Sequence, residues 1–186
     1  MAGDAKNTAL WQGADVYIAP EGTAGPNDVT SAWGSDWKLV GLLDGEEGFT
    51  ESRDQDTAEH YAWGGILYKR TTSKHKRSFK FVALEDNAVT FGLVNPGSTR
   101  TSSNGVRRGT IKVPTRARFA LGQEIRDGDK IKRRIVAHAE VSEIGEIKES
   151  ESEPTVYEIT VLVFPTADGT LYETIETDPD YLAEAE

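Results

Sequence analysis

The chain has 186 residues, a formal net charge of −10 and no cysteine. This length predicts one domain with a sizeable core, and the lack of cysteine excludes disulfides, thiolate metal sites and cysteine nucleophiles. No apolar run approaches the roughly 20 residues that span a bilayer, and the N-terminal sequence MAGDAKNTALWQG lacks the basic start and apolar stretch of a signal peptide.

The charges are segregated along the chain. Residues 1–60 contain 3 Lys and Arg against 12 Asp and Glu, residues 61–140 contain 17 against 6, and residues 141–186 contain 1 against 13. This order indicates either that basic and acidic patches of different copies meet, or that the charges neutralise one another within one subunit. The sequence is compatible with both.

The N-terminal part predicts an arm, a strand and a loop. Residues 1–13 are expected to form a flexible arm with one apolar pair, Leu10 and Trp11. Residues 14–19 alternate as a first strand. Residues 20–36 are rich in Gly, Pro, Asn and Ser, which predicts a long loop.

The central part contains the clearest strand pattern. An apolar strand over residues 37–43 is expected to end in a hairpin turn at Asp44–Gly45, because Gly tolerates positive φ, and residues 46–65 predict a long, acidic, extended loop. A pair of basic strands, residues 66–72 and 74–84, follows. In the second of them one face is apolar and the other polar. The apolar face is formed by Phe79, Phe81 and Ala83.

The region after these strands predicts a short helix over residues 85–94, begun by Glu85 or Asp86, and a long exposed loop over residues 95–109. A strand is expected over residues 110–121, where Pro114 indicates an edge or a bulge. Its inward face would be formed by Ile111, Val113, Ala117, Phe119 and Leu121.

The C-terminal part predicts strands over residues 130–141, 155–164 and 171–175, with a turn at residues 127–129, and an acidic tail over residues 178–186. About eight strands and one helix favour a mostly β domain over residues 14–177. We expect a β-sandwich or partly closed barrel with one short flanking α-helix and extended arms and loops.

Catalytic motifs are missing from the sequence. His60, His75 and His138 do not have metal-ligand spacing, and no phosphate-binding or nucleophile motif is found, so we expect neither an enzyme nor a cofactor. The middle of the chain is basic, but the protein as a whole is acidic, with a pI of about 4.9. A stable grip on nucleic acid is therefore disfavoured.

The order of parts in residues 44–94 resembles a known family. The segment contains, in order, an Asp-Gly turn, an acidic stretch, Ala62-Trp63-x-Gly65, a Thr-rich strand and Phe79-x-Phe81-x-x-Leu84-Glu85-x-Asn87. It is similar to the central segment of the major tail (tail tube) proteins of long-tailed bacteriophages, especially those that infect actinobacteria, and weaker similarity continues to about residue 177. In this chain Glu46-Glu47-Gly48 lengthens the turn, which puts the register of the next strand in doubt.

The resemblance implies a structural protein of the virion tail, assembled in the cytoplasm of the bacterial host. Its subunits would join sheets around hexameric rings, and the rings would stack into a tube through which double-stranded DNA passes without sticking. The implied partners are further copies of the chain, the tape-measure protein, and tail-tip or terminator proteins. No membrane is implied.

The resemblance and the charge pattern together point to two sets of candidate residues. The residues expected to contact neighbouring subunits are Trp63, Arg70, Lys74, Lys76 and Arg77. The residues expected to face the channel are Glu46, Glu47, Glu51 and Glu158. Two alternatives stay open at this point: Trp63 could cap the core of its own subunit, and the carboxylates could lie on the outer surface.

Two other classes of protein fit the composition. The first is a different virion module, such as a tail terminator, a head decoration protein or a receptor-binding β-domain, which would form a finite oligomer. The second is a small β-sandwich enzyme or a carbohydrate-binding domain. That class needs aromatic side chains along one groove, whereas the four Trp, at positions 11, 33, 37 and 63, do not share a strand face.

Overall fold

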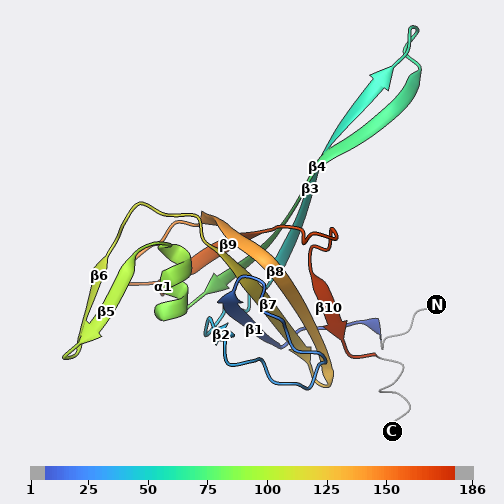
Figure 1. Cartoon of the computed structure of the whole chain (residues 1–186). Helices are drawn as coiled ribbons and strands as arrows, with labels where there is room; N and C mark the ends of the chain where they lie inside the picture. The colour runs from blue at the N-terminus through green and yellow to red at the C-terminus, as the bar shows by residue number, and fades with distance from the viewer. Residues whose placement is uncertain (1–6, 179–186) are drawn as a thin grey trace.

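The computed structural model describes residues 7–178, which fold mostly into antiparallel β-strands (Figure 1). In chain order the elements are β1 (Gly13–Pro20), β2 (Lys38–Leu39), β3 (Thr50–Tyr61), β4 (Leu67–Ala83), α1 (Ala88–Val94), β5 (Thr99–Ser103), β6 (Val106–Thr110), β7 (Arg118–Asp127), β8 (Lys130–Ile144), β9 (Tyr157–Val163) and β10 (Glu173–Glu176). The predicted fold class, mostly β with one short flanking helix, is confirmed.

Eight of the strands form one antiparallel sheet in the order β2-β1-β7-β8-β9-β4-β3, and β10 also pairs with β8. The long β8 is shared: its first half pairs with β10 and its second half with β9. The sheet is not closed into a barrel. Residues 40–44 bridge β1 and β4: Val40 N donates to Val16 O in β1, and Asp44 N donates to Val82 O in β4.

The larger hydrophobic core lies on the face of the sheet that α1 covers. Leu93 of α1 packs there with buried residues of β1, β4, β7, β8 and β9. Phe79, Phe81 and Ala83 of β4 are all buried, as their alternation predicted. The helix begins three residues later than predicted, because Asn87 is its N-cap: its side chain accepts hydrogen bonds from the backbone N–H groups of residues 89 and 90.

A smaller cluster lies on the opposite face, under the loop between β1 and β2. Trp33 stacks on Tyr17 with 4.5 Å between ring centroids and meets the edge of Trp37 at 4.9 Å. Two of the four Trp are therefore in contact, which the sequence did not indicate. Gly122 of β7 is required beneath them, because a Cβ there would lie 2.4 Å from the Trp33 ring.

A buried ion pair holds this loop on the sheet. Glu124 of β7 and Arg133 of β8 are each only 5% exposed, and Arg133 Nε donates to Glu124 Oε2 at 2.8 Å. Glu124 also accepts from Trp33 Nε1, while Arg133 Nη1 donates to the backbone oxygens of Asp28 and Ser31. The polar groups of the loop are thus satisfied by side chains that lie far away in the sequence.

The predicted secondary structure is wrong in two neighbouring regions. Residues 95–109 contain the β5–β6 hairpin instead of a loop, and residues 111–117 form no strand, so Ile111 and Val113 are exposed instead of inward. The strand predicted over residues 37–43 is reduced to β2. The turn after Asp44 joins β2 to β3, which do not pair, so it is not a hairpin turn.

The described part of the N-terminal arm lies along the β7–β8 turn. Leu10 N donates to Asp127 Oδ2, and the Thr8 oxygen accepts from Lys130 Nζ. Leu10 and Trp11 remain exposed. Residues 1–6 of the predicted arm, and all but Asp178 of the predicted acidic tail, lie outside the described residues.

Candidate assembly interface

A two-stranded ribbon, residues 55–75, formed by the far halves of β3 and β4, is exposed over nearly its whole length. It projects from the body of the molecule on the side away from α1 (Figure 1). The long loop expected over residues 46–65 is therefore wrong, because residues 50–61 are β3. The far half of this strand has no apolar alternation because neither of its faces is buried, and the pattern that indicates a strand depends on burial.

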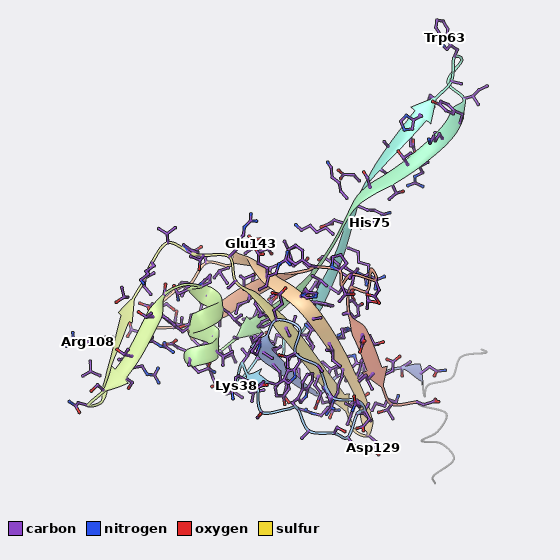
Figure 2. The ribbon with its side chains drawn as sticks, in the orientation of Figure 1. Lys38, Trp63, His75, Arg108, Asp129 and Glu143 are labelled. Atoms are coloured by element: carbon purple, nitrogen blue, oxygen red, sulfur yellow. The ribbon has the colours of Figure 1, made fainter. Side chains whose placement is uncertain are left out.

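The ribbon begins at a β-bulge. Asp54 pairs with Lys76 but Asp56 pairs with Ser73, so β4 has one residue more than β3 at this point. Lys74, in the bulge, has a φ of 55°, a left-handed conformation that is uncommon outside glycine. Bulges bend and twist a strand pair, and His75 lies at the base of the projecting ribbon (Figure 2).

Large apolar side chains are exposed around the tip of the ribbon. Trp63 is 101% exposed and lies at the far end of the molecule (Figure 2). Its neighbours Tyr61, Ile66, Leu67 and Tyr68 are also exposed. Trp63 therefore does not cap the core of its own subunit. An isolated two-stranded ribbon is marginally stable in water, and exposed apolar patches mark interaction sites, so this tip has the composition of a contact surface.

The basic residues predicted to contact other subunits have different surroundings. Arg77 belongs to the body, where its Nη1 lies 3.1 Å from both Glu51 Oε1 and the Tyr172 hydroxyl oxygen. Lys74 is on the ribbon and pairs with Asp56 at 2.7 Å. Arg70 and Lys76 lie opposite Glu59 and Asp54 in the β3–β4 register, and neither forms an ion pair within residues 7–178.

The segregated charges are partly neutralised within the subunit. Ion pairs join the basic middle of the chain to both acidic flanks. They are Arg126–Asp15, Arg118–Glu21, Arg77–Glu51, Lys74–Asp56, Lys80–Glu158 and Lys132–Glu176. Several of these side chains are half-exposed or more, and exposed pairs of this kind contribute about 1 kcal/mol or less each.

The carboxylates predicted to face the channel do not form one patch. Glu51 lies opposite Phe79 on the core side of the sheet, whereas Glu158 lies opposite Val82 on the other side. Burial alone would raise the pKa of Glu51, but hydrogen bonds from Arg53 and Tyr172 and the charges of Arg53 and Arg77 lower it below its usual value. Glu51 is therefore a partner of the subunit's own cations.

A polar sheet surface, which we call the polar face, lies on the side of β3, β4, β9 and β8 away from the larger core. Two rows of cross-strand neighbours form it. They are Thr50, Lys80, Thr160 and Glu143 in one row, and Ser52, Ser78, Leu162 and Glu140 in the other. Glu158 and Glu47 lie near Lys80, at 3.0 and 4.0 Å from its Nζ, and the hydrogen bond to Glu158 raises the pKa of Lys80.

The sequence prediction missed Glu140 and Glu143. The signal that could have found them is the polar set of alternate residues in β8 and β9, which faces away from the apolar set. The prediction named Glu158 of β9 but used the apolar set alone in β8. Glu46 is exposed in the turn before β3, with its backbone N–H bonded to Asp44 Oδ1 at 2.8 Å.

The described residues hold no arrangement typical of catalysis or metal binding. Within residues 7–178, no group of three or more His, Asp or Glu could hold a metal ion. His138 Nδ1 lies 2.7 Å from Glu21 Oε1, and His60 lies on the ribbon near Thr71. The helix of the described region is not long and apolar enough to cross a membrane.

Comparisons with known proteins agree with a structural part of a tail. No curated protein matches the sequence. The fold is similar to that of a chain in the PVC sheath–tube complex of an extracellular contractile injection system in its extended state. The TM-score is 0.50 and the sequence identity 9%, over 93% of this chain and 95% of that chain. At this identity the likeness concerns the fold alone.

Two further solved structures are more distant. A chain of the PVC sheath/tube terminator in the extended state has a TM-score of 0.47 and 10% identity, over 89% of this chain and 93% of that chain. The tube-terminating cap of the anti-feeding prophage has a TM-score of 0.46 and 12% identity, over 95% of this chain and 100% of that chain. The family described as phage tail tube protein matches residues 1–185. The chain therefore belongs to the phage tail tube protein family and is a structural protein of the phage tail, not an enzyme.

Proposed function

We propose that this chain is the major tail tube subunit of a long-tailed phage of the siphovirus type, and that it polymerises into stacked hexameric rings. The subunits assemble in the cytoplasm of the bacterial host and become part of the virion tail. The channel of the tube carries double-stranded DNA into the next host during ejection. The observation that carries this proposal is the exposed apolar tip of the ribbon.

The ribbon supports self-assembly because its surface differs from the surfaces of the body. A projecting patch that docks on a different surface of another copy makes a heterologous contact, and such contacts generate rings or filaments. Five large apolar side chains at the tip, from Tyr61 to Tyr68, supply the anchors. Trp and Tyr are the residue types that most often dominate such interfaces.

The polar face supports a channel lining. Its carboxylates, Glu140, Glu143 and Glu158, with Glu47 nearby, outnumber the neighbouring cations. These cations are Lys80, Arg116, which lies 3.8 Å from Glu140, and Arg118, which lies opposite Glu140 in β7. A surface with excess negative charge repels phosphate groups and keeps DNA from sticking. Glu46 is a further candidate for this surface, whereas Glu51, on the other side of the sheet, is not.

The expected partners follow from the same geometry. A tube that is built by heterologous contacts exposes donor surfaces at one end and acceptor surfaces at the other. Each end then needs its own closing protein, which fits a tail-tip protein at one end and a terminator at the other. A tape-measure protein would occupy the channel before the DNA.

Removal of the ribbon tests the proposal. Because Asp56 and Ser73 are paired, replacing residues 57–72 by Asn-Gly closes the two strands with a tight hairpin turn. In negative-stain electron microscopy we expect the wild-type protein to form tubes of uniform width. The shortened variant should remain a folded monomer, as judged by circular dichroism and its thermal midpoint.

A matched control keeps the ribbon and changes the second hairpin. Replacing Val106 in β6, an exposed apolar residue away from the ribbon, by Ala should leave tube formation intact. A wild-type protein that stays monomeric at every concentration and ionic strength would refute the proposal. Normal tubes from the shortened variant would show that the ribbon is not the assembly element.

A further inference from the structure

We propose that the tip of the ribbon, centred on Trp63, docks in an apolar groove beside α1 of a second copy of the chain. This inference rests on the proposed self-assembly and names the surface that receives the ribbon. The tip contributes a fully exposed indole flanked by the exposed side chains of Ile66 and Leu67. A docking partner for it must offer a concave apolar surface.

The groove between α1 and the β1–β7 edge has that character. It has a volume of about 480 Å³ and is lined mostly by apolar residues, with Asp36, Lys38 and Arg118 at its edges. They include Ala88, Val89 and Gly92 from α1, Ile18 from β1 and Phe119 from β7. A Trp side chain buries about 150–250 Å² in such a site, more than other side chains.

Gly92 lines the groove on the exposed side of α1. Gly within a helix is less favourable than Ala by about 1 kcal/mol. A Cβ at this position would have no atom within 4 Å, so nothing inside the described chain requires a glycine there. A larger side chain at this position would project into the groove and occupy it.

Charged side chains lie at the edges of both surfaces. Asp36, Lys38 and Arg118 line the groove, and Arg118 lies 3.6 Å from Glu21. Lys69 and Arg70 lie on the ribbon near its tip and form no ion pair within residues 7–178. Among the charged residues of the groove only Asp36 is opposite in sign to them, so the docking rests on the apolar contact, and an approach of Arg70 to Asp36 would fix its orientation.

The occupant must be another copy, because the tip cannot reach the groove of its own chain. Lys38, which lines the groove, lies in the body of the molecule, whereas Trp63 lies at the far end of the projecting ribbon (Figure 2). Separate donor and acceptor surfaces on one subunit allow every copy to give one contact and receive another. This is the arrangement from which rings and tubes are built.

Cysteine cross-linking in assembled tubes tests the docking. The chain has no cysteine of its own, so the double variant Ala62→Cys/Ala88→Cys places one thiol beside Trp63 and one in the groove. Mild oxidation should give a ladder of covalent oligomers on a non-reducing gel, and either single variant should give no ladder.

Two matched controls place the second thiol in other concave parts of the surface. Ala62→Cys is combined with Ala9→Cys, in the N-terminal arm, or with Ala24→Cys, beside residues 166–175. All of these alanines are exposed. We expect the Ala88 pair to cross-link at least about tenfold faster than either control pair. Wild-type tubes in which a control pair cross-links as fast as the Ala88 pair, or in which the Ala88 pair gives no ladder, would overturn the docking and leave the proposed function standing.

A substitution that fills the groove gives a second readout. Gly92→Leu should raise the protein concentration needed for tube formation by about tenfold or more, which corresponds to about 1.4 kcal/mol, while the monomer stays folded. Gly92→Ala adds only a methyl group and should have a smaller effect. Tube formation by Gly92→Leu at the wild-type concentration would contradict the docking. A wild-type chain that never assembles would overturn the proposed function and the docking together.

Discussion

The two halves of β4 have opposite surroundings, although they form one continuous strand. Residues 78–83 pair with β9, residues 78–80 also pair with β3, and Phe79, Phe81 and Ala83 are at most 1% exposed. Residues 67–77 pair with β3 alone, and Leu67 and Tyr68 are exposed. The near half is stabilised by its own subunit. The far half has apolar side chains that the described part of its own subunit leaves exposed, so we expect assembly to stabilise it.

The largest expected effect is a difference between the two halves in how much a substitution lowers the free energy of unfolding. Phe81→Ala should lower the free energy of unfolding by about 3–5 kcal/mol, because it leaves a cavity in a packed core. Tyr68→Ala, on the ribbon, should change it by less than about 0.5 kcal/mol. Urea unfolding of the two monomeric variants measures both values. Similar losses for the two would show that the ribbon is packed in the free subunit.

The next effect concerns the buried pair that holds the β1–β2 loop. Glu124→Gln leaves the guanidinium of Arg133 buried without its counter-charge, so we expect a loss of about 3 kcal/mol in the free energy of unfolding. Urea titrations of wild type and variant at neutral pH give the difference. An unchanged midpoint would show that water reaches Arg133.

The same pair predicts a pH dependence. Burial alone would raise the pKa of Glu124, but hydrogen bonds from Trp33 and Arg126 and the charge of Arg133 lower it below its ordinary value of 4.5. A depressed pKa means that the contribution of Glu124 to stability is present above pH 4.5 and lost as pH falls toward the folded-state pKa. The stability difference between wild type and Glu124→Gln should therefore shrink below pH 4.5, and a constant difference would argue against it.

A smaller free-energy change is expected at the tip, and only in assembly. Trp63→Ala removes the central anchor, and a hot-spot residue contributes about 2 kcal/mol or more. The concentration at which tubes form should rise about 30-fold, while the unfolding midpoint of the monomer stays unchanged. Sedimentation of tubes over a concentration series measures the shift. A lower midpoint without an assembly defect would instead place Trp63 in the subunit's own packing.

The sequence predicted the body better than its projections, for a physical reason. Alternation in Phe79, Phe81 and Ala83 reports burial against the chain's own core, and it was read correctly. Alternation also led to the wrong placing of Ile111 and Val113, because Pro114 cannot donate to a ladder and no partner strand lies beside them. Residues 55–61 gave no pattern because nothing in the subunit buries them.

Other features could be read only in part. The β5–β6 hairpin has a signal that was missed: Asn104–Gly105, with φ of 51° and 75°, suits the tight turn that joins neighbouring strands. The Glu124–Arg133 pair and the contact between Trp33 and Trp37 had no local signal, since they depend on the register of β7 and β8 and on the path of a long loop. The exposed position of Trp63 agrees with a contact surface, and its role between subunits stays a prediction. The polar face was read in part, through the polar side of the strand over residues 74–84 and Glu158, whereas Glu140 and Glu143 of β8 were missed.

The smallest expected effect lies at the bulge that separates the two halves of β4. Lys74 has a φ of 55°, a conformation that costs an L-residue roughly 1–2 kcal/mol and costs glycine little. Lys74→Gly should therefore keep the bulge, and Lys74→Val should oppose it, because a β-branched side chain is least tolerated at positive φ. Both variants remove the ion pair with Asp56, so the comparison between them isolates the backbone.

The measurement is hydrogen exchange of the ribbon amides together with tube formation. If the bulge aims the ribbon, Lys74→Val should speed exchange near residues 72–76 and weaken assembly by a few-fold, and Lys74→Gly should assemble like wild type. The amides of the body should show the same protection from hydrogen exchange in both variants. Phe79 and Phe81 are neither adjacent to Lys74 in sequence nor part of the bulge in the β3–β4 register. If Lys74→Val instead assembled as well as Lys74→Gly, the direction of the ribbon would be set by the neighbouring subunit and not by the bend built into β4.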